Sequence, residues 1–488
     1  MAVSKIVLSS LIHIRPITCA ASYHTRLVPH PPDLVKWVKK EGGFVHQAVK
    51  IFPQEDNETY GLGLVASQDI PKGSLLIALP DHIPLKFESD AGDGADSVLV
   101  DLASQVPVYF DMSRQIGNVL RSELEEELWA MKLGLKLLQE RARLGSFWWP
   151  YISNLPETYS VPIFFQGEDI KNLQYAPLLY QVNKRCRFLL DFDQEVRRAL
   201  ANVKPNDHPF GGQELNASSL GWAMSAVSSR AFRLHGKKLA AGTRNEVVAE
   251  TEIKQNDSLL LNYGCLSNDF FLLDYGFVMP SNPYDTIELK YEGALMDAAS
   301  MAAGVSSPNF SSPAAWQQRI LSQLNLVGET AIVKVSAYSH LVSATSSFLE
   351  AMNITSDLFN SQQVSLGGPE LVEGRLLAAL RVLLASDSET VQKHDLNTLQ
   401  SLSAEAPLGI TNEVAVFRTI IALCAIALEH FPTKIMEDES LLKQGVSAST
   451  VLVIQFRIQK KTLIIDIMRN LSRRVKLLSS KETTATQG

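Results

Sequence analysis

Cysteine is scarce in this chain, and its few cysteines lie far apart. Of 488 residues only four are cysteines, namely Cys19, Cys186, Cys265 and Cys424. Structural zinc sites and disulfide frameworks need cysteines at short, regular spacings, which this set does not provide. The sequence therefore predicts a reduced protein with no metal site.

An excess of basic charge is also lacking. The chain has 45 lysines and arginines against 52 acidic residues, which gives a formal net charge of -7. Nucleic-acid binding needs a clustered basic face, so we expect no nucleic-acid partner. An apolar content of 46% and a charged content of 20% are typical of globular proteins. At this length two or three domains are expected, because single cores stop growing at about 250–300 residues.

Long apolar runs are absent as well. The longest candidate, Ile420 to Leu428, is flanked by Arg418 and Glu429 and is much shorter than the roughly 20 residues that span a bilayer. The sequence therefore predicts no membrane segment.

Acidic residues are missing from the first 32 positions, since Asp33 is the first acid. This segment contains Lys5, Arg15 and Arg26 together with several serines, which is the composition of a transit peptide. We therefore expect import into the chloroplast stroma, with the mitochondrion as the alternative. The short apolar piece at 6–14 is less typical of a secretory signal.

Two stretches far apart in the sequence share a pattern of strand, turn and strand. They span residues 60–80 and 247–261, and their alignment pairs Ile70 with Ile253. Similar hairpins in two places indicate a small β-rich domain built from both, with an insertion between them.

Residues 257–280 combine several local signals. Ser258 to Leu261 has the pattern of a buried strand, and Gly264 allows the backbone to turn after it. Ser267 is a suitable cap for a short helix, which Gly276 can end. Taken alone, this stretch is most simply an ordinary strand, turn and helix whose tyrosines pack in the core.

The remaining patterns are helical. A first amphipathic face, in the insertion, consists of Leu124, Leu128, Met131, Leu135 and Leu138. An aromatic cluster at 147–151 follows and suits a corner between helices. From about residue 298 we expect only helices, with three apolar stripes that predict a bundle core. These stripes are Leu376, Leu377, Leu380, Leu383 and Leu384; Phe417, Ile420, Ile421, Cys424 and Leu428; and Val453, Phe456, Leu463, Ile467 and Leu471.

Several of these stretches together resemble one protein family. A strand that leads into Tyr263-Gly264, a short acidic helix and then Tyr275-Gly276-Phe277 resembles the C-terminal signature of SET-domain protein-lysine methyltransferases. More narrowly, it is similar to the plant branch typified by the Rubisco large-subunit methyltransferase. The insertion, Ser229-Arg230-Ala-Phe, and the segments 370–375, 432–442 and 454–461 resemble other parts of the same family.

The resemblance implies an α+β fold, in which a SET-domain β fold is split by a helical insert and followed by an all-α substrate-binding domain of the Rubisco methyltransferase type. The implied division is a transit peptide (1–32), the N-terminal part of the SET domain (33–110), the insert (111–216), the shortened C-terminal part of the SET domain (217–294), the substrate-binding domain (295–478) and a disordered tail (479–488).

The resemblance also implies a site. Its cofactor would be S-adenosyl-L-methionine and its substrate a protein lysine. Tyr263 would be the catalytic tyrosine, and four residues would form the lysine channel: Tyr275, Ser229, Arg230 and Phe277. The loop Gly61-Leu62-Gly63 would approach the cofactor with its backbone, although such a Gly-x-Gly is more often a simple hairpin turn. A lone Arg230 is likewise more often part of a surface salt bridge.

One feature of the family is missing. SET methyltransferases carry an Asn-His pair that holds the cofactor, expected here between Phe232 and Tyr263, and no Asn-His occurs in the chain. A skipped exon or an incorrect gene model would explain the gap. The sequence thus predicts a lysine methyltransferase acting on a plastid protein, such as the Rubisco large subunit or plastid aldolase. The alternative is a catalytically impaired form that binds proteins through its helical domain. A monomer is the default expectation.

Overall fold

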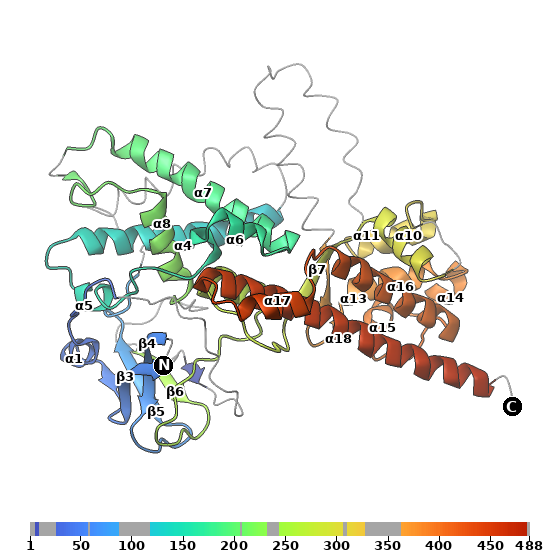
Figure 1. The fold of residues 1–488 in the computed structure, drawn as a ribbon, viewed down its shortest axis with the longest axis horizontal. Coiled ribbons are helices and arrows are strands. Elements are labelled where there is room, and N and C mark those ends of the chain that lie inside the picture. The colour runs from blue at the N-terminus through green and yellow to red at the C-terminus, as the bar shows by residue number, and fades with distance from the viewer. Residues whose placement is uncertain are drawn as a thin grey trace. The chain divides into compact units, whose positions relative to one another are not determined.

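The computed structural model describes residues 5–8, 26–56, 59–86, 118–204, 207–231, 244–305, 310–326 and 363–485 (Figure 1). The chain divides into two compact units. The first comprises Met1–Asn172, Leu178–Met279 and Val446–Val453, and the second comprises Leu173–Pro177, Pro280–Gly445 and Ile454–Gly488. The α+β class is confirmed, whereas the finer domain boundaries drawn from the sequence stay predictions.

The first unit combines short strands with a helical region. Its four-stranded sheet has the order β1-β6-β5-β2, in which β1 is parallel to β6 and the other neighbours are antiparallel; β3 and β4 form a separate hairpin. The strands are β1 (Lys5–Leu8), β2 (Phe44–Val45), β3 (Val49–Asp56), β4 (Thr59–Ala66), β5 (Leu75–Pro80) and β6 (Arg244–Ala249). The helices are α1 (Leu34–Lys40), α4 (Asn118–Ala142), α5 (Trp149–Ile152), η2 (Pro162–Phe164), α6 (Gly167–Lys171), α7 (Ala176–Leu200), α8 (Ala217–Ser228), α9 (Asn268–Phe270) and η4 (Phe271–Tyr275).

The second unit is mainly helical but contains a sheet of order β7-β8-β9. Its strands are β7 (Thr286–Lys290), β8 (Gln363–Gly367) and β9 (Leu371–Val372), and its helices are α10 (Gly293–Ala302), α11 (Ala315–Gln323), α13 (Gly374–Leu383), α14 (Ser388–Gln392), α15 (Leu396–Gln400), α16 (Ile410–Glu429) and α17 (Ile435–Leu442). Helix α18 (Ala448–Ala485) begins among residues of the first unit.

The two similar stretches of the sequence pair with each other. Ile70 and Ile253 each donate a backbone N–H to the other's carbonyl, at 2.8 and 2.9 Å. Both side chains are buried, in a core that they share with Ala66, Leu76 and Ala249. The expected union of the two hairpins is therefore confirmed, and Figure 1 shows β5 and β6 side by side although about 170 residues separate them.

The segment after the second turn differs from expectation. Ser258 to Leu261 was predicted as a buried strand, but only an isolated bridge joins Ser258 to Val65, and Leu260 is 58% exposed. The segment leaves β4 after Leu259, whose N–H donates to the Leu64 carbonyl. Because the segment pairs with no strand beyond Leu259, its apolar residues are not placed on the buried face of a sheet.

The helical insertion has its own core. Met131, Leu135 and Leu138 of α4 are buried, as the spacing predicts, against residues of α7 and α8. Leu124 and Leu128 lie in α4 outside the residues whose side chains the structure describes. A Cβ on Gly134 would lie 3.3 Å from that of Ala223, so the glycine permits a close approach of α4 and α8.

The aromatic cluster at 147–151 packs as a corner, which is the simpler of the two interpretations. Phe147 contacts Trp148 and Trp37 at ring distances of 5.3 and 5.4 Å. The Trp148 indole donates a hydrogen bond of 2.9 Å to the Ile83 carbonyl. These contacts join the helical insertion to α1 and to the turn that follows β5.

Three expectations for the C-terminal part are wrong in detail. Strands β8 and β9 interrupt the predicted helices, because Leu371 at φ +64° and Gly368 at φ +64° turn the chain back on itself. The predicted disordered tail at 479–488 continues α18 as far as Ala485. Lys481 pairs there with Glu405, while the buried Leu478 anchors the preceding turn.

The third correction concerns the prediction that no apolar run is long enough to span a bilayer, because helix α16 is such a run. By length and composition it is the one helix of the described residues that is apolar enough to cross a membrane, although 44% of its apolar window is buried. It packs against α10 and α13 and carries the buried, ion-paired Glu413. We therefore interpret α16 as a core helix of the bundle.

The segment predicted as a transit peptide also contains structure. Its residues Lys5–Leu8 form β1, parallel to β6. Removal of this segment during import stays a prediction. Such removal would expose one edge of β6.

A buried ionic cluster lies where α17 meets α18. Asp438 accepts hydrogen bonds from Arg457 at 2.9 Å and from Lys461 at 2.6 Å, and all three residues are at most 2% exposed. Lys460 is buried as well and donates to Asp285 at 2.8 Å. The basic residues at 454–461 thus have structural roles in this unit.

Acid is expected to weaken this cluster. Burial alone would raise the pKa of Asp438, but hydrogen bonds from Arg457 and Lys461 hold it below its ordinary value. The ionised carboxylate therefore stabilises the fold above about pH 3.9, the value of an unfolded aspartate, and this stabilisation is lost as pH falls through the lower pKa of the folded state. Urea unfolding between pH 5 and pH 3 should show it, at roughly 1.4 kcal/mol per unit of pKa difference.

The matched variant is Asp438→Asn, which cannot titrate. Its free energy of unfolding should be lower throughout but should depend less steeply on pH in this range. An equal slope in the variant and the wild type would show that other carboxylates cause the acid effect.

Candidate active site

The turn η4 carries the tyrosine of the predicted channel. Ser267 occupies the N-cap position of the preceding short helix, as expected, but its side chain forms no capping hydrogen bond. The turn η4 is π-helical and ends at Gly276 with φ +75°. Single π-helical turns are rare and are frequently found at functional sites. This geometry places Tyr275 and Phe277 on either side of a left-handed residue.

Four aromatic rings meet at this turn. The ring of Tyr263 lies 4.7 Å from that of Tyr275 and 6.1 Å from that of Phe277. Phe271, which the sequence did not single out, stacks on Phe277 at 4.8 Å and contacts both tyrosines. Tyr263 is 40% exposed, whereas Phe271 is buried. The structure therefore joins three of the predicted site residues in one cluster with an open side at Tyr263.

An ion pair to the helical insertion holds η4 in place. Arg185 of α7 donates to the Asp274 carboxylate at 2.5 Å and to the Leu273 carbonyl at 3.3 Å. Burial raises the pKa of the Tyr275 hydroxyl, and the charge of the adjacent Asp274 raises it further. Tyr275 is therefore a neutral wall of the site at physiological pH.

Ser229 and Arg230 lie at the end of α8. The Ser229 hydroxyl donates to the Ser225 carbonyl at 2.6 Å and accepts a hydrogen bond from Arg230 at 2.6 Å. The Arg230 guanidinium lies 5.1 Å above the ring of Tyr159, within the range of a cation–π contact. Arg230 thus packs on an aromatic ring and forms no salt bridge among the described residues.

Tyr159 and Ser160 connect these two groups of residues. The backbone of Ser160 touches Gly276, since a Cβ on that glycine would lie 2.6 Å from the Ser160 oxygen. Tyr159 is 9% exposed, and its buried hydroxyl has no hydrogen-bond partner in the described part of the chain. Sequence reasoning missed both residues, because only their contacts with distant segments mark them.

Gly276→Ala should therefore disturb the site. The backbone at φ +75° and the Ser160 oxygen both oppose a side chain, so we expect a loss of about 1–3 kcal/mol in the free energy of unfolding. Gly264→Ala is the control, since this glycine has φ +84° but a Cβ added to it would meet no atom within 4 Å. Thermal unfolding of both variants gives the difference between their losses of free energy of unfolding, which is the steric contribution of Ser160. Equal losses would mean that Ser160 makes no steric contribution.

Gly61, Leu62 and Gly63 lie within β4 and not in a loop, which corrects the prediction. They pair with Gln54, Pro53 and Phe52 of β3. The Ser67 N–H donates to the Ala48 carbonyl, so Ser67 and Ala48 form a hydrogen-bonded pair of the hairpin. Hydrogen-bonded and non-hydrogen-bonded pairs alternate along antiparallel strands, and the backbone groups of Gly61 and Gly63 therefore point to β3.

The backbone groups of Leu62 face the other edge of β4. On that edge Ala66 bonds to Asp257, and Leu64 accepts from Leu259. Leu62 is next in this series, in the direction in which the chain continues from Leu259 toward Tyr263. Of the three predicted cofactor residues, Leu62 is the one whose N–H and C=O are left open by the hairpin.

The described residues fit a methylsulfonium cofactor in two respects. Electron-rich faces of the four rings attract a sulfonium cation, and the Leu62 backbone offers one donor and one acceptor. The Asn-His contacts of the SET family are missing from the sequence. No group of three histidine, cysteine, aspartate or glutamate side chains within the described ranges is arranged to hold a metal ion.

This chain is similar in sequence and in structure to known proteins. The model of the Rubisco LSMT substrate-binding family matches residues 309–464. An actin-histidine N-methyltransferase of Callithrix jacchus is 24% identical over 471 residues, which cover 89% of this chain and 67% of that protein.

Two solved structures share the fold. The SET domain of LSMT bound to lysine and AdoHcy has a TM-score of 0.54 and 17% identity, over 91% of this chain and 92% of that one. Rubisco LSMT bound to AdoMet has a TM-score of 0.54 and 17% identity, over 92% of both chains. The chain therefore shares the fold of the SET domain of Rubisco LSMT, and its residues 309–464 match the Rubisco LSMT substrate-binding family.

Proposed function

We propose that this protein is an S-adenosylmethionine-dependent protein-lysine N-methyltransferase. The observation that carries the proposal is the cluster of Tyr263, Tyr275, Phe271 and Phe277, in contact through Ser160 with the segment that holds Arg230. S-adenosylmethionine would supply an electrophilic methyl group. Leu62 and the ring faces are the residues that would hold it.

The rings favour the neutral form of a lysine acceptor. In water the lysine pKa is about 10.4, so well under 1% of the amine is unprotonated at neutral pH. An aromatic channel excludes water and penalises the charged form, which lowers that pKa. The Tyr263 hydroxyl, at the open side of the cluster, would accept or donate a hydrogen bond to orient the amine nitrogen.

A lysine acceptor is proposed first because the segments Tyr263-Gly264 and Tyr275-Gly276-Phe277 resemble the signature of protein-lysine methyltransferases. The actin-histidine relative makes histidine the second acceptor to test. Parallel assays on lysine-containing and histidine-containing protein fractions, with amino-acid analysis of the methylated product, separate the two.

The N-terminal composition supports the proposed location, and the family resemblance suggests the proposed partner. The basic, acid-free first 32 residues support import into the chloroplast stroma, with the mitochondrion as the alternative. The Rubisco large subunit and plastid aldolase are the first protein substrates to test. Fusion of residues 1–32 to a fluorescent reporter would show the compartment, and retention in the cytosol would overturn this part.

Binding of S-adenosylmethionine to the full chain, measured by calorimetry, tests the proposal most directly. A second protein with an Asn-His segment inserted before β6 is the matched control. Binding to both supports the enzyme, while binding to neither argues against the cofactor site.

The absent Asn-His pair favours one further candidate function. If only the control binds the cofactor, the natural chain would act as a protein-binding module through its C-terminal unit. Deletion of residues 295–480 should then abolish capture of Rubisco or aldolase. Retained capture would contradict this second function.

A further inference from the structure

The turn that carries Tyr275 cannot hold its shape by local bonds. Helix α9 has three residues and η4 has five, and within the described part of the chain no side chain caps the start of either. The backbone bond that closes the turn, from the Phe277 N–H to the Phe271 carbonyl, is long at 3.3 Å. Helices of this length are not stable by themselves. The shape of the turn therefore depends on contacts with other segments.

Asn268 ties the two ends of this segment together. Its carboxamide donates to the Met279 carbonyl at 3.0 Å and accepts from the Met279 N–H at 2.9 Å. Three apolar side chains of the turn are buried as well, namely Phe271, Leu272 and Leu273. Apolar burial keeps the turn in the core, but it has no preferred direction. These contacts alone leave the rotation of the turn, and with it the direction of Tyr275, undetermined.

Arg185 of α7 supplies a directional contact. One guanidinium nitrogen, Nη1, donates both to the Asp274 carboxylate at 2.5 Å and to the Leu273 carbonyl at 3.3 Å. The two acceptors belong to the consecutive residues that precede Tyr275. The contact therefore fixes the peptide group between them and the direction in which the chain enters Tyr275. The side chains of Arg185 and Asp274 are 16% and 18% exposed, so water and salt screen this pair less than a surface pair.

The direction of Tyr275 shapes the candidate channel. Its ring lies 4.7 Å from that of Tyr263, and the following Gly276 is pressed against the Ser160 backbone. A misplacement of about 1 Å at a reacting group can lower a rate by roughly 100-fold. A rotation of η4 would therefore impair the site even though every side chain of the aromatic cluster is still present.

We propose that Arg185 is a positioning residue of the active site, and that the helical insertion sets the orientation of Tyr275 through it. Arg185 acts through Asp274 and the Leu273 carbonyl and takes no part in the chemistry. The proposal rests on the proposed function in one respect, that Tyr275 is a wall of the acceptor channel. It assigns to α7 a control over the site that the aromatic residues themselves do not provide.

The first test compares rates of methyl transfer per folded protein at saturating S-adenosylmethionine. Arg185→Gln should lower the rate at least about ten-fold, because Tyr275 is no longer held in one direction. Arg185→Lys should recover most of the rate, since a single nitrogen makes both contacts and an ammonium can replace it. A normal rate in Arg185→Gln, or an equal loss in Arg185→Lys, would overturn the proposal.

Arg198→Gln is the matched control on the same helix. Arg198 pairs with Glu195 three residues earlier, and its side chain is 65% exposed. This pair joins residues of one helical turn and holds no other element. The control should keep the rate of the wild type, and a loss equal to that of Arg185→Gln would contradict the proposal.

A double-mutant cycle examines whether Arg185 acts through Asp274. Asp274→Asn removes the charge that Arg185 contacts. If the two residues act as one unit, the double variant Arg185→Gln with Asp274→Asn should be no slower than Arg185→Gln alone. Multiplication of the two separate losses would show independent roles and would contradict the proposal.

Two measurements do not depend on activity. In spectra of isotope-labelled tyrosine, with Tyr275→Phe to assign the signal, the Tyr275 resonance should shift in Arg185→Gln and stay in place in Arg198→Gln. The Phe277 amide should exchange at least about ten-fold faster in Arg185→Gln, while the amides of α4 keep their protection. A uniform rise in exchange across this unit would indicate a general loss of stability and would contradict a positioning role.

These measurements separate the two proposals. A wild-type protein without any methyl transfer would contradict the proposed function. The tyrosine spectra would then still decide whether Arg185 orients Tyr275, and an unchanged Tyr275 signal in Arg185→Gln would overturn the positioning role.

Discussion

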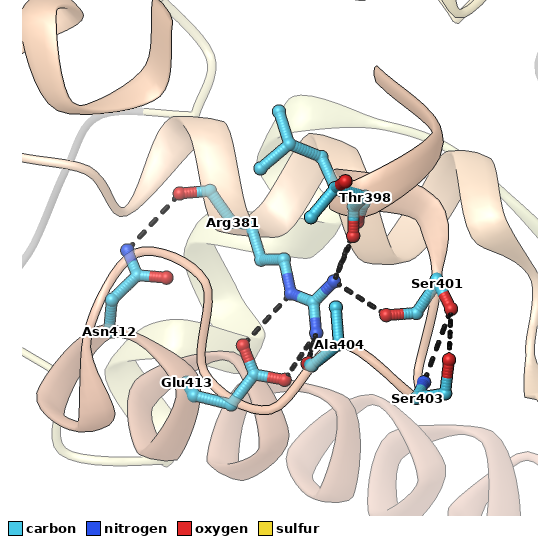
Figure 2. A network of polar contacts seen from close by, with 8 residues as sticks. Arg381, Thr398, Ser401, Ser403, Ala404, Asn412 and Glu413 are labelled. Carbon is cyan, nitrogen blue, oxygen red and sulfur yellow. Dashed lines mark hydrogen bonds and ion pairs between the residues drawn. The ribbon is translucent and has the colours of Figure 1, made fainter. Parts of the chain in front are cut away.

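Replacement of Arg381 by alanine is expected to lower the free energy of unfolding of the C-terminal unit by about 3–5 kcal/mol. The substitution leaves Glu413 as a buried, unpaired charge and removes the donor of several backbone carbonyls (Figure 2). The Glu413 carboxylate and the Leu399 carbonyl are buried, so water cannot replace the hydrogen bonds that they lose. Urea unfolding, with hydrogen exchange of α13 and α16 as a local probe, measures the loss.

Arg198→Ala provides the matched control. Arg198 also forms a two-point pair, with Glu195 of the same helix, but it is largely exposed. Surface pairs of this kind contribute about 0–1 kcal/mol. The double variant Arg381→Met with Glu413→Leu should recover part of the loss, because it removes both charges together. Losses of equal size in Arg381→Ala and Arg198→Ala would contradict the role assigned to the buried pair.

Tyr263→Phe is expected to lower kcat by roughly 100-fold or more, the typical effect of removing one oriented hydrogen-bond partner from a reacting group. The substitution keeps the ring and its contacts with Tyr275 and Phe277, and it deletes the hydroxyl alone. Because the side chain is 40% exposed, we expect the thermal stability to stay unchanged. Initial rates of methyl transfer at saturating S-adenosylmethionine measure the effect.

Tyr180→Phe is the control for loss of an exposed tyrosine hydroxyl, since Tyr180 is 39% exposed on α7. It should leave the rate within experimental error. The cofactor affinity of Tyr263→Phe should also match that of the wild type, because the hydroxyl is assigned to the acceptor amine. A normal rate in Tyr263→Phe, or an equal loss in Tyr180→Phe, would remove Tyr263 from the catalytic role.

Local sequence was sufficient for the apolar faces of the helices and for the pairing of the strands around Ile70 and Ile253. Alternation and turn residues identified the strands around Ile70 and Ile253, and their likeness indicated that they belong together. Helical spacing marked the buried faces of α4, α13, α16 and α18, since apolar residues that repeat at the period of the α-helix lie on one face, which packs in the core. The sequence also predicted that Gly276 ends the helix at η4, because few other residues adopt its φ angle.

The ends of strands and the polar contacts could not be predicted from the sequence in the same way. The sequence does not show that Ser258 to Leu261 lacks a partner beyond its first residues, or that β8 and β9 turn on Leu371. Both depend on which other backbone groups are already paired. For the same reason the three residues Gly61–Gly63 looked equivalent, whereas the register leaves only the backbone of Leu62 free of the hairpin.

The sequence by itself determined the resemblance to SET-domain methyltransferases, the apolar faces of the helices, and the identity of the tyrosines at the candidate site, because each of these depends on neighbouring residues. Tertiary structure decided what surrounds those tyrosines and what holds the C-terminal unit together. Arg185 reaches Asp274, Ser160 meets Gly276, and Arg381 meets Glu413 across long separations in sequence. Such contacts leave no periodic trace, since a charged or polar residue is equally acceptable to the local backbone whether its partner is water or a distant side chain.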